Sequence, residues 1–233
     1  MPQTKPPAKV KSRLSVENRG QAGAIVATNG NSRSRDKYQR ILDAAITVIA
    51  EKGFHNSRVS EIAQRADVAS GTVYLYFKSK EQILMAALDG AFQSFFRRAQ
   101  NEIAGASDAA ERLHILARLH LQALSRNRSI AVVLQTELRQ SAKFLAQFSQ
   151  QEMKAYFNLI REIIREGQRA GSIRPDVSDK IAASCFFGAL DELVTAWVLS
   201  TREYDLAAAA DEVVNLLLGG MGSGKKTPAE ADS

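Results

Sequence analysis

Residues 70–80 read Ser-Gly-Thr-Val-Tyr-Leu-Tyr-Phe-Lys-Ser-Lys, and this stretch contains more polar and small residues than packing requires. Only Val73 and Phe77, with Tyr76 as a further candidate, are needed for packing. The other residues present small hydrogen-bonding groups, one aromatic hydroxyl and two ammonium groups. Small residues at a helix N-terminus let the backbone approach DNA closely, and hydroxyl and amide groups bind phosphate. The stretch therefore predicts a short helix that lies against DNA.

The residues before this stretch predict two more helices. Apolar residues recur at three- and four-residue steps between Tyr38 and Ile49, and Gly53 follows where a left-handed cap is wanted. Ser57 is a good N-cap for a short second helix, which ends at Asp67, a residue that tolerates the left-handed conformation. Two short helices behind a supporting helix have the dimensions of a helix-turn-helix.

The rest of the chain is predicted to be helical throughout. Ser79 opens a longer helix, 79–98, and further helices are expected at 108–125, 129–146, 149–170, 177–200 and 204–218. The expected fold is all-α with about nine helices. It divides into a disordered basic arm (1–34), a three-helix helix-turn-helix domain (35–81), a larger ligand-binding and dimerisation bundle (82–220) and a disordered tail (221–233).

Charge and cysteine usage narrow the class of protein. The chain carries a net charge of +6, and residues 1–40 hold nine bases and two acids, so the excess lies at one end, as expected for a polyanion-binding protein. A single cysteine, Cys185, excludes a disulfide framework and Cys-rich zinc modules. Neither a run of 18 apolar residues nor an export signal is found. These features predict a soluble cytoplasmic protein without a membrane partner.

Three patterns could suggest chemistry, and none has the required form. Residues 219–225, GGMGSGK, follow a helix rather than a strand and place Lys226 where a phosphate loop needs Ser or Thr. His55, His114 and His120 lack metal-ligand spacing and are interpreted as surface or packing residues. No Ser, His and acid cluster has nucleophile-elbow spacing. The sequence predicts no catalytic residues, no metal and no cofactor.

The recognition stretch resembles TetR-type bacterial repressors. Residues 53–81 follow the pattern G-F-x₂-[TS]-x₄-I-A-x₃-G-V-[SA]-x-G-T-[LIV]-Y-x-Y-F-x-S-K-E, with Asp67 in place of the usual Gly. The resemblance implies a repressor that binds a double-stranded DNA operator. It implies that Ser70, Gly71 and Tyr74 face the major groove, and that the DNA backbone is held by Ser57, Arg58, Thr72, Tyr76, Lys78 and Lys80. The alternative that Tyr74 and Tyr76 only pack the small domain stays open.

The last two helices predict a homodimer. Helix 177–200 is apolar on more than one side and must be buried on more than one side, and the next helix has the same excess. Core packing could explain this pattern, but a dimer explains it more simply, as the resemblance also implies. The expected dimer residues are Phe186, Ala189, Leu193, Trp197, Val213 and Leu217. Two-fold symmetry then predicts a palindromic operator.

The bundle combines many aromatic residues with many arginines, which suits an amphipathic anion with a long tail. Its scattered residues, such as 134–141 and 187–192, resemble the TetR branch that controls fatty-acid degradation, whose members leave DNA when long-chain acyl-CoA binds. The expected ligand residues are Arg139, Phe148, Phe157, Phe187 and Asp191, with Arg139 at the CoA phosphates. Two alternatives remain: a repressor of this fold that senses a hydrophobic drug or cation, and a helical enzyme that handles acyl-CoA.

Overall fold

The computed structural model describes residues 32–139 and 152–222 of the chain. The helices of the N-terminal part are α1 (Ser32–Lys52), α2 (Val59–Arg65), α3 (Ser70–Tyr76) and α4 (Lys80–Ile103). They are followed by α5 (Ala109–Ser125), α6 (Arg128–Val132), the π-helix η1 (Val133–Leu138), α8 (Lys154–Ala170), α9 (Asp179–Leu199), the 3-10 helix η3 (Leu206–Ala209) and α10 (Ala210–Met221). The predicted all-α fold is confirmed.

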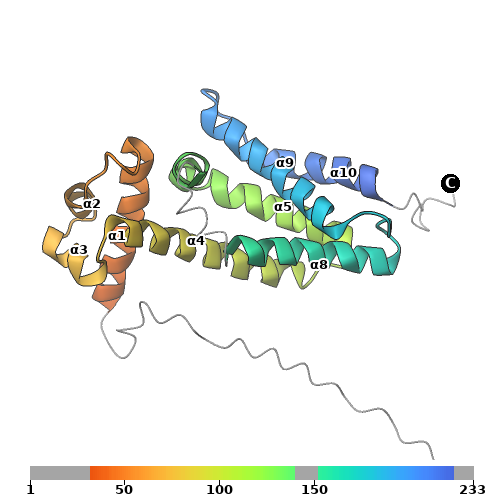
Figure 1. The fold of residues 1–233 in the computed structure, drawn as a ribbon, viewed down its shortest axis with the longest axis horizontal. Coiled ribbons are helices and arrows are strands. Elements are labelled where there is room, and N and C mark those ends of the chain that lie inside the picture. Colours follow the sequence, from red (N-terminus) through yellow and green to blue (C-terminus); the bar gives the residue numbers. More distant parts are fainter. Residues whose placement is uncertain (1–31, 140–151, 223–233) are drawn as a thin grey trace, which may run out of the picture.

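Helices α1, α2 and α3 form a compact unit at one end of the molecule, and the long α4 connects this unit to the bundle (Figure 1). The turns form where the sequence predicts them, because Gly53 and Asp67 adopt left-handed φ angles of 78° and 53°. The Ser79 hydroxyl accepts a hydrogen bond from Gln82 N at 3.2 Å and caps α4. These caps fix where α3 points relative to α4.

The N-cap predicted for the second helix is wrong by one residue. Arg58 occupies that position, and its backbone N–H donates to the Glu61 carboxylate at 2.9 Å. The Ser57 hydroxyl instead donates to Phe54 O at 2.9 Å, and the residue is buried. Ser57 therefore closes the turn between α1 and α2 rather than starting α2.

The bundle consists of α4, α5, α8, α9 and α10, with α5 packed against α4, α8, α9 and α10. One hydrophobic core fills this bundle, and a second one lies beneath α1, α2 and α3. The second core includes Ile83 to Leu88 of α4 and also Val133 and Leu138 of η1. The start of the bundle and the three-helix unit therefore share one packed core.

The helix predicted at 129–146 differs from the structure. It forms the short α6 and then the π-helix η1, and residues 140–151 lie outside the described part of the chain. The Thr136 hydroxyl donates to Val132 O at 2.8 Å, a side-chain bond that competes with the regular helical ladder. Wider helical turns of this kind occur frequently at functional sites.

The two ends of the described chain extend the predicted domains by a few residues. Helix α1 begins at Ser32, and Met221 is still helical and buried. Gly222 forms a bridge with Ile173. The rest of the expected arm and tail lies outside the described residues, and the division at residue 81 stays a prediction.

Helix α9 has the length and hydropathy of a membrane-crossing helix, the one such case among the described residues. In the fold it packs against α8, α5 and α10. Its central acid, Asp191, points inward and accepts a hydrogen bond from Gln135 Nε2 at 2.8 Å. Its apolar character is that of a bundle helix.

Candidate DNA-binding surface and ligand cavity

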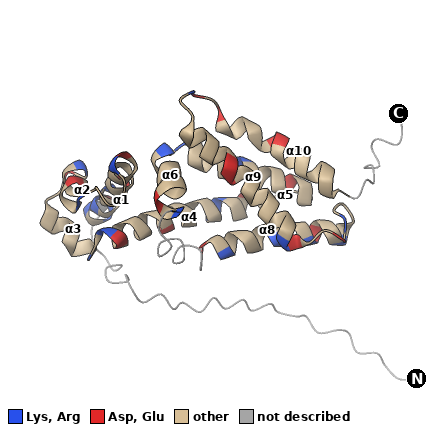
Figure 2. Cartoon of the chain, turned by 45° about the horizontal axis from the view of Figure 1, so that its top comes forward, with Lys and Arg blue, Asp and Glu red and all other residues tan. Residues whose placement is uncertain are grey.

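Helix α3 exposes a face of small and aromatic residues. Ser70, Gly71 and Tyr74 are exposed, and Thr72 is half-buried. A Cβ built on Gly71 would meet no atom within 4 Å, so the glycine leaves bare backbone on the surface. The seven residues of α3 include no charged side chain, whereas α1 and α2 beside it carry several (Figure 2). The geometry suits close approach of the α3 backbone to a groove.

Three residues expected to hold the DNA backbone instead stabilise the domain itself. Ser57 is buried, and Lys80 Nζ donates to Phe54 O and, at 2.6 Å, to Ser57 O. Burial lowers the pKa of Lys80, and its ammonium lies 4.4 Å from the centre of the Phe54 ring. The Tyr76 hydroxyl is hydrogen-bonded to Ser34 Oγ at 2.9 Å. In this conformation these three side chains are occupied within the protein.

Arg58, at the start of α2, and Lys78, after the end of α3, are exposed and can meet phosphate. Sequence reasoning missed a third exposed residue, Leu75. It is 84% exposed, the most exposed large apolar side chain described, and it follows Tyr74, which is 57% exposed. The sequence contained a sign of this role, because Leu75 is the one apolar residue of 70–80 that packing does not need.

We expect Leu75→Ala to weaken operator binding about 5- to 10-fold, roughly 1 kcal/mol, with little change for non-specific DNA. An exposed leucine on a reading helix matches the methyl group of thymine in the major groove. Replacing operator thymines one at a time by deoxyuracil should reproduce the loss at one position. In the Leu75→Ala protein that replacement should have no further effect, as titrations at fixed salt can measure.

Lys78→Ala is the control for this experiment. We expect Lys78→Ala to weaken binding to all DNA sequences alike. The slope of log K against log salt should become shallower by roughly one, because one phosphate contact is removed. If the wild-type protein bound every deoxyuracil operator as tightly as the thymine operator, a methyl contact would be contradicted.

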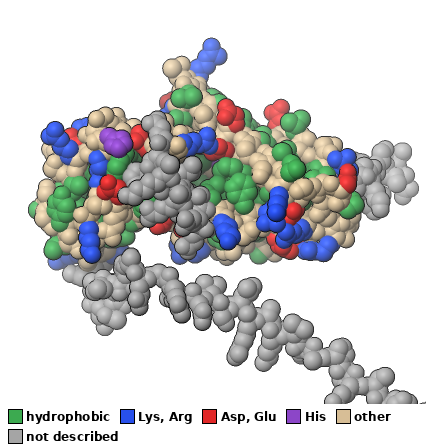
Figure 3. Space-filling model, viewed as in Figure 1, with side chains coloured by type: hydrophobic (Ala, Val, Ile, Leu, Met, Phe, Trp, Pro, Cys, Tyr) green, Lys and Arg blue, Asp and Glu red, His purple; other side chains and the backbone are tan. Residues whose placement is uncertain are grey.

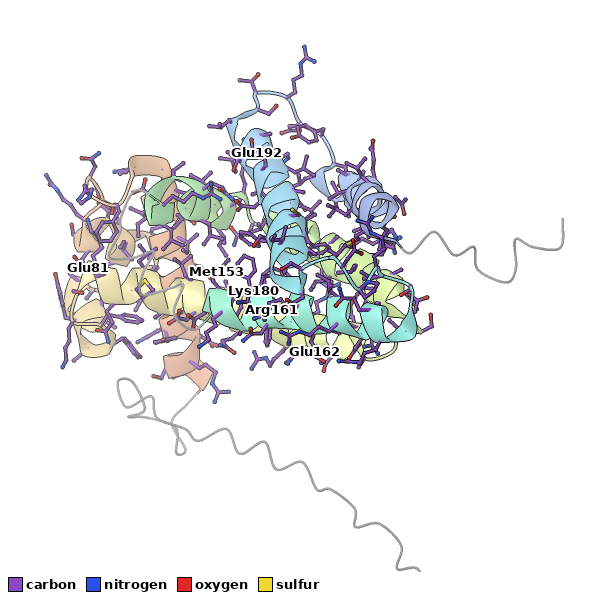
Figure 4. The ribbon with its side chains drawn as sticks, turned by 45° about the vertical axis from the view of Figure 1, so that its right-hand side comes forward. Glu81, Met153, Arg161, Glu162, Lys180 and Glu192 are labelled. Atoms are coloured by element: carbon purple, nitrogen blue, oxygen red, sulfur yellow. The ribbon has the colours of Figure 1, made fainter. Side chains whose placement is uncertain are left out.

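A cavity of about 250 Å³ lies between α4, α5, η1, α8 and α9. Its wall is mostly apolar, and a few polar groups converge on it. Met153, which also lines it, is labelled in Figure 4 at the start of α8, next to α4. The main lining residues are Leu88, Phe92, Phe95, His120, Ile130, Leu134, Gln135, Leu138, Arg139, Tyr156, Phe187 and Asp191. Such a site suits an apolar ligand with one polar end.

Of the predicted ligand residues, Arg139, Phe187 and Asp191 line this cavity. Phe157 lies behind the wall and packs on Phe187, with ring centres 5.1 Å apart, and Phe148 lies outside the described residues. Sequence reasoning grouped Phe92, Phe95 and Tyr156 with the core aromatics and did not place them at the ligand.

The charged groups of the cavity are paired with one another. The guanidinium of Arg139, whose side chain is 45% exposed, is bonded to the carboxylate of Asp191. Asp191 also accepts from Gln135, and Gln135 Oε1 accepts from the Thr195 hydroxyl at 3.0 Å. This cluster joins η1 to α9 at the exposed edge of the cavity.

Two of the three histidines pair with other side chains. His114 Nδ1 lies 3.0 Å from an Asp211 oxygen, away from the cavity. His120 lines the cavity, and its Nδ1 lies 2.9 Å from the Tyr156 hydroxyl. Burial lowers the pKa of His120 to about 4 and raises that of Tyr156. Both His120 and Tyr156 are therefore neutral near pH 7.

One side chain joins the cavity wall to the three-helix unit. Glu137 of η1 accepts a hydrogen bond from Phe54 N at 2.8 Å, in the turn between α1 and α2. The carbonyl of Phe54 in turn accepts from Lys80 at the start of α4. Leu134 and Leu138, which flank Glu137 in η1, line the cavity. Sequence reasoning missed Glu137, since no local pattern relates it to a turn 83 residues earlier.

The expected dimer residues divide into two groups. Phe186 and Trp197 are buried within the protomer, and the Trp197 indole donates to Tyr204 O at 3.3 Å, so neither is available to a partner. Ala189, Leu193, Val213 and Leu217 are partly exposed. The strongly exposed large apolar residues of α9 and α10 are Ile181, Leu199 and Leu216, at 65%, 73% and 78%. The exposed apolar side of α9 is thus roughly opposite Phe186 around the helix axis.

A helix-turn-helix unit joined through a long helix to an α-helical bundle with an apolar cavity defines a ligand-responsive, DNA-binding transcription regulator. Two family models match the chain: bacterial regulatory proteins of the tetR family over residues 41–87, and the YsiA-like protein C-terminal region over residues 89–220. The chain belongs to the TetR family. It is a transcription regulator and not an enzyme.

The relatives below match about four fifths of this chain. The fatty acid metabolism regulator protein of Bacillus subtilis is 40% identical over 189 residues, which are 81% of this chain and 97% of that protein. The fatty acid degradation regulator FadR of Bacillus halodurans superposes with a TM-score of 0.76 at 39% identity, covering 83% of this chain and 98% of that one. FadR of B. subtilis in complex with stearoyl-CoA superposes with a TM-score of 0.75 at 40% identity, covering 79% of this chain and 99% of that one.

Proposed function

We propose that this protein represses genes of fatty-acid degradation and that long-chain acyl-CoA releases it from a palindromic operator. One observation supports this most strongly: an apolar cavity with an arginine at its exposed edge, in a chain 40% identical to a fatty acid metabolism regulator. A TetR-family chain acting on DNA inside the cell is also the basis for placing it in the cytoplasm.

In the proposed complex the acyl chain lies against Phe92, Phe95 and Phe187, and the CoA phosphates meet Arg139 at the edge. Arg139 is already paired with Asp191, so a phosphate must share or replace that carboxylate. Replacing it would remove the ion pair that links the end of η1 to α9 and leave the Asp191–Gln135 hydrogen bond as a weaker link between them. The ligand head group thus acts on the π-helix that holds Glu137.

Release from DNA requires that the ligand bind one conformation more tightly than the other, because equal affinity shifts no population. The Glu137 contact gives a physical route for this difference. Movement of η1 would remove the acceptor from Phe54 N and shift the turn that Lys80 connects to α4. The two reading helices of a dimer would then leave the spacing of roughly 34–36 Å that adjacent half-sites demand.

We propose that the dimer forms through the outward faces of α9 and α10. Ile181, Cys185, Gly188 and Leu199 recur on one side of α9, and Leu216 and Gly219 lie on the outer side of α10. Figure 3 shows apolar side chains in the part of the surface where these helices lie, and Figure 4 labels Glu192 on α9. Small residues among large ones let two helix pairs pack closely.

The second candidate, a sensor of hydrophobic cations, is less favoured by the charges. A cation site needs an uncompensated carboxylate, and Asp191, the acid in the cavity wall, is compensated by Arg139 and Gln135. Glu192, the next residue of α9, is exposed and does not line the cavity.

The test is DNA binding to the region upstream of the protein's own gene, at fixed salt, with stearoyl-CoA, stearate and CoA as separate additions. We expect loss of the complex with stearoyl-CoA alone. Arg139→Ala should bind stearoyl-CoA about 10-fold more weakly, because charge-assisted contacts to phosphate are lost. A complex indifferent to all three additions would exclude the acyl-CoA effector, and unchanged affinity of Arg139→Ala would remove Arg139 from the site.

A further inference from the structure

We propose that His120 binds the carbonyl oxygen of the ligand's thioester, so that the cavity selects acyl thioesters over alkyl chains of the same length. The inference rests on the proposed function and specifies which atoms of the ligand are recognised. It comes from a polar group that the packing of the protein leaves unused.

His120 has one hydrogen-bond partner among the described residues, the Tyr156 hydroxyl at Nδ1. Only 8% of the residue's surface is accessible, and it lines the cavity. In the described part of the chain, Arg112 Nε is the only fully buried side-chain nitrogen or oxygen without a partner. Nε2 of His120 therefore keeps accessible surface, and the cavity is where that surface lies.

The hydrogen bond at Nδ1 determines whether Nε2 of His120 is a donor or an acceptor. The phenol of Tyr156 has one hydrogen to donate, and His120 Nδ1 is its partner, so the satisfied arrangement has the hydroxyl donating to Nδ1. A neutral imidazole that accepts at Nδ1 carries its hydrogen at Nε2. His120 thus offers the cavity an N–H donor, and the rings of Phe95 and Phe187, at 6.2 and 5.9 Å, hold the imidazole in place.

A buried donor needs an acceptor in the ligand, since an unpaired polar group in an apolar site is costly. The acceptor should be neutral, because His120 is uncharged near pH 7 and supplies no counter-charge to an anion buried in this apolar wall. A carboxylate would lose its hydration there without an ionic partner, whereas a thioester carbonyl carries no charge. Exposure falls from Arg139 through Asp191 to His120, which matches the order of phosphates, thioester and acyl chain in the ligand.

The experiment compares three probes: stearoyl-CoA, its thioether analogue S-octadecyl-CoA, which lacks the carbonyl, and stearate. Affinity is measured by calorimetry and, separately, by release of operator DNA. We expect the wild-type protein to bind the thioether about 10-fold more weakly than stearoyl-CoA, the worth of one buried hydrogen bond. Stearate should bind more weakly than stearoyl-CoA.

Three variants test whether His120 causes the difference in affinity between stearoyl-CoA and the thioether. In His120→Phe the preference for stearoyl-CoA over the thioether should disappear, with thioether affinity kept. Tyr156→Phe keeps the ring and removes the hydroxyl that fixes the imidazole, so the preference should fall by several-fold. His114→Phe, a matched histidine of α5 that lies outside the cavity, should keep the full preference.

The outcomes separate the two proposals. Equal binding of stearoyl-CoA and S-octadecyl-CoA to the wild-type protein would overturn the role of His120 and leave the acyl-CoA sensor standing. A preference that persists in both His120→Phe and Tyr156→Phe would also overturn it. Binding of neither CoA compound would overturn the effector itself, and the inference with it.

Discussion

Leu216→Glu should convert the protein to a monomer and weaken operator binding by at least about 100-fold. Leu216 is 78% exposed in the protomer, so the substitution removes no core contact and the fold should survive. In an isologous interface the new carboxylate would meet its own copy or be buried without a partner, and both are costly. A monomer binds one half-site and loses the gain of roughly 10² to 10⁴ that linked binding provides.

Light scattering after gel filtration and titration of operator DNA measure the two effects. Cys185, the single cysteine, is exposed on the face of α9 that we propose for the dimer. Its reactivity gives a third measurement. Its thiol should react slowly in the wild-type dimer and rapidly in the Leu216→Glu protein. Gln100→Glu adds the same charge at an exposed position of α4 and should change nothing. A dimeric Leu216→Glu protein with normal DNA affinity would place the interface elsewhere.

Glu137→Ala should remove most of the response of DNA binding to the ligand while leaving ligand affinity in the absence of DNA within about twofold. The carboxylate is the acceptor for Phe54 N, and it belongs to the π-helix that forms the cavity wall. Couplings between two sites are typically about 1–3 kcal/mol, a factor of about 5 to 150. We expect that factor to fall below about 3 once the contact is lost.

The coupling can be measured in both directions, because DNA must weaken the ligand by the same factor as the ligand weakens DNA. Thr136→Ala is the matched control, since the Thr136 hydroxyl donates to Val132 O at the junction of α6 and η1 and not to the three-helix unit. If Glu137→Ala kept the wild-type factor, the signal would have to travel through α4 or through the hydrophobic core that η1 shares with the three-helix unit.

Local patterns in the sequence predicted most of the helices and turns and the cap of α4, although the N-cap expected at Ser57 is Arg58. The left-handed residues Gly53 and Asp67, the Ser79 cap and the short α3 all depend on neighbours within a few positions, and these predictions are confirmed. The π-helix η1 was missed, because its hydrogen-bond register depends on packing between α9 and the three-helix unit. A helical period alone cannot distinguish it from an α-helix.

The candidate sites were predicted less completely, for a different reason. Residue type indicated that Arg139 and Phe187 could meet a ligand, but the roles of Lys80 and His120 are decided by contacts across 26 and 36 residues. Lys80 looked like a phosphate contact and is tied to the carbonyl of Phe54. His120 looked like a packing residue and is the buried polar group of the cavity.

The absence of charge from the seven residues of α3 separates how strongly the regulator is attracted to DNA from which sequence it prefers. Attraction comes from cations outside this helix and weakens as ionic strength rises, at every site on a genome alike. Discrimination between sites comes from uncharged groups, whose contacts respond little to salt. A change in the ionic strength of the cell would therefore alter the occupancy of all operators together and leave their ranking intact.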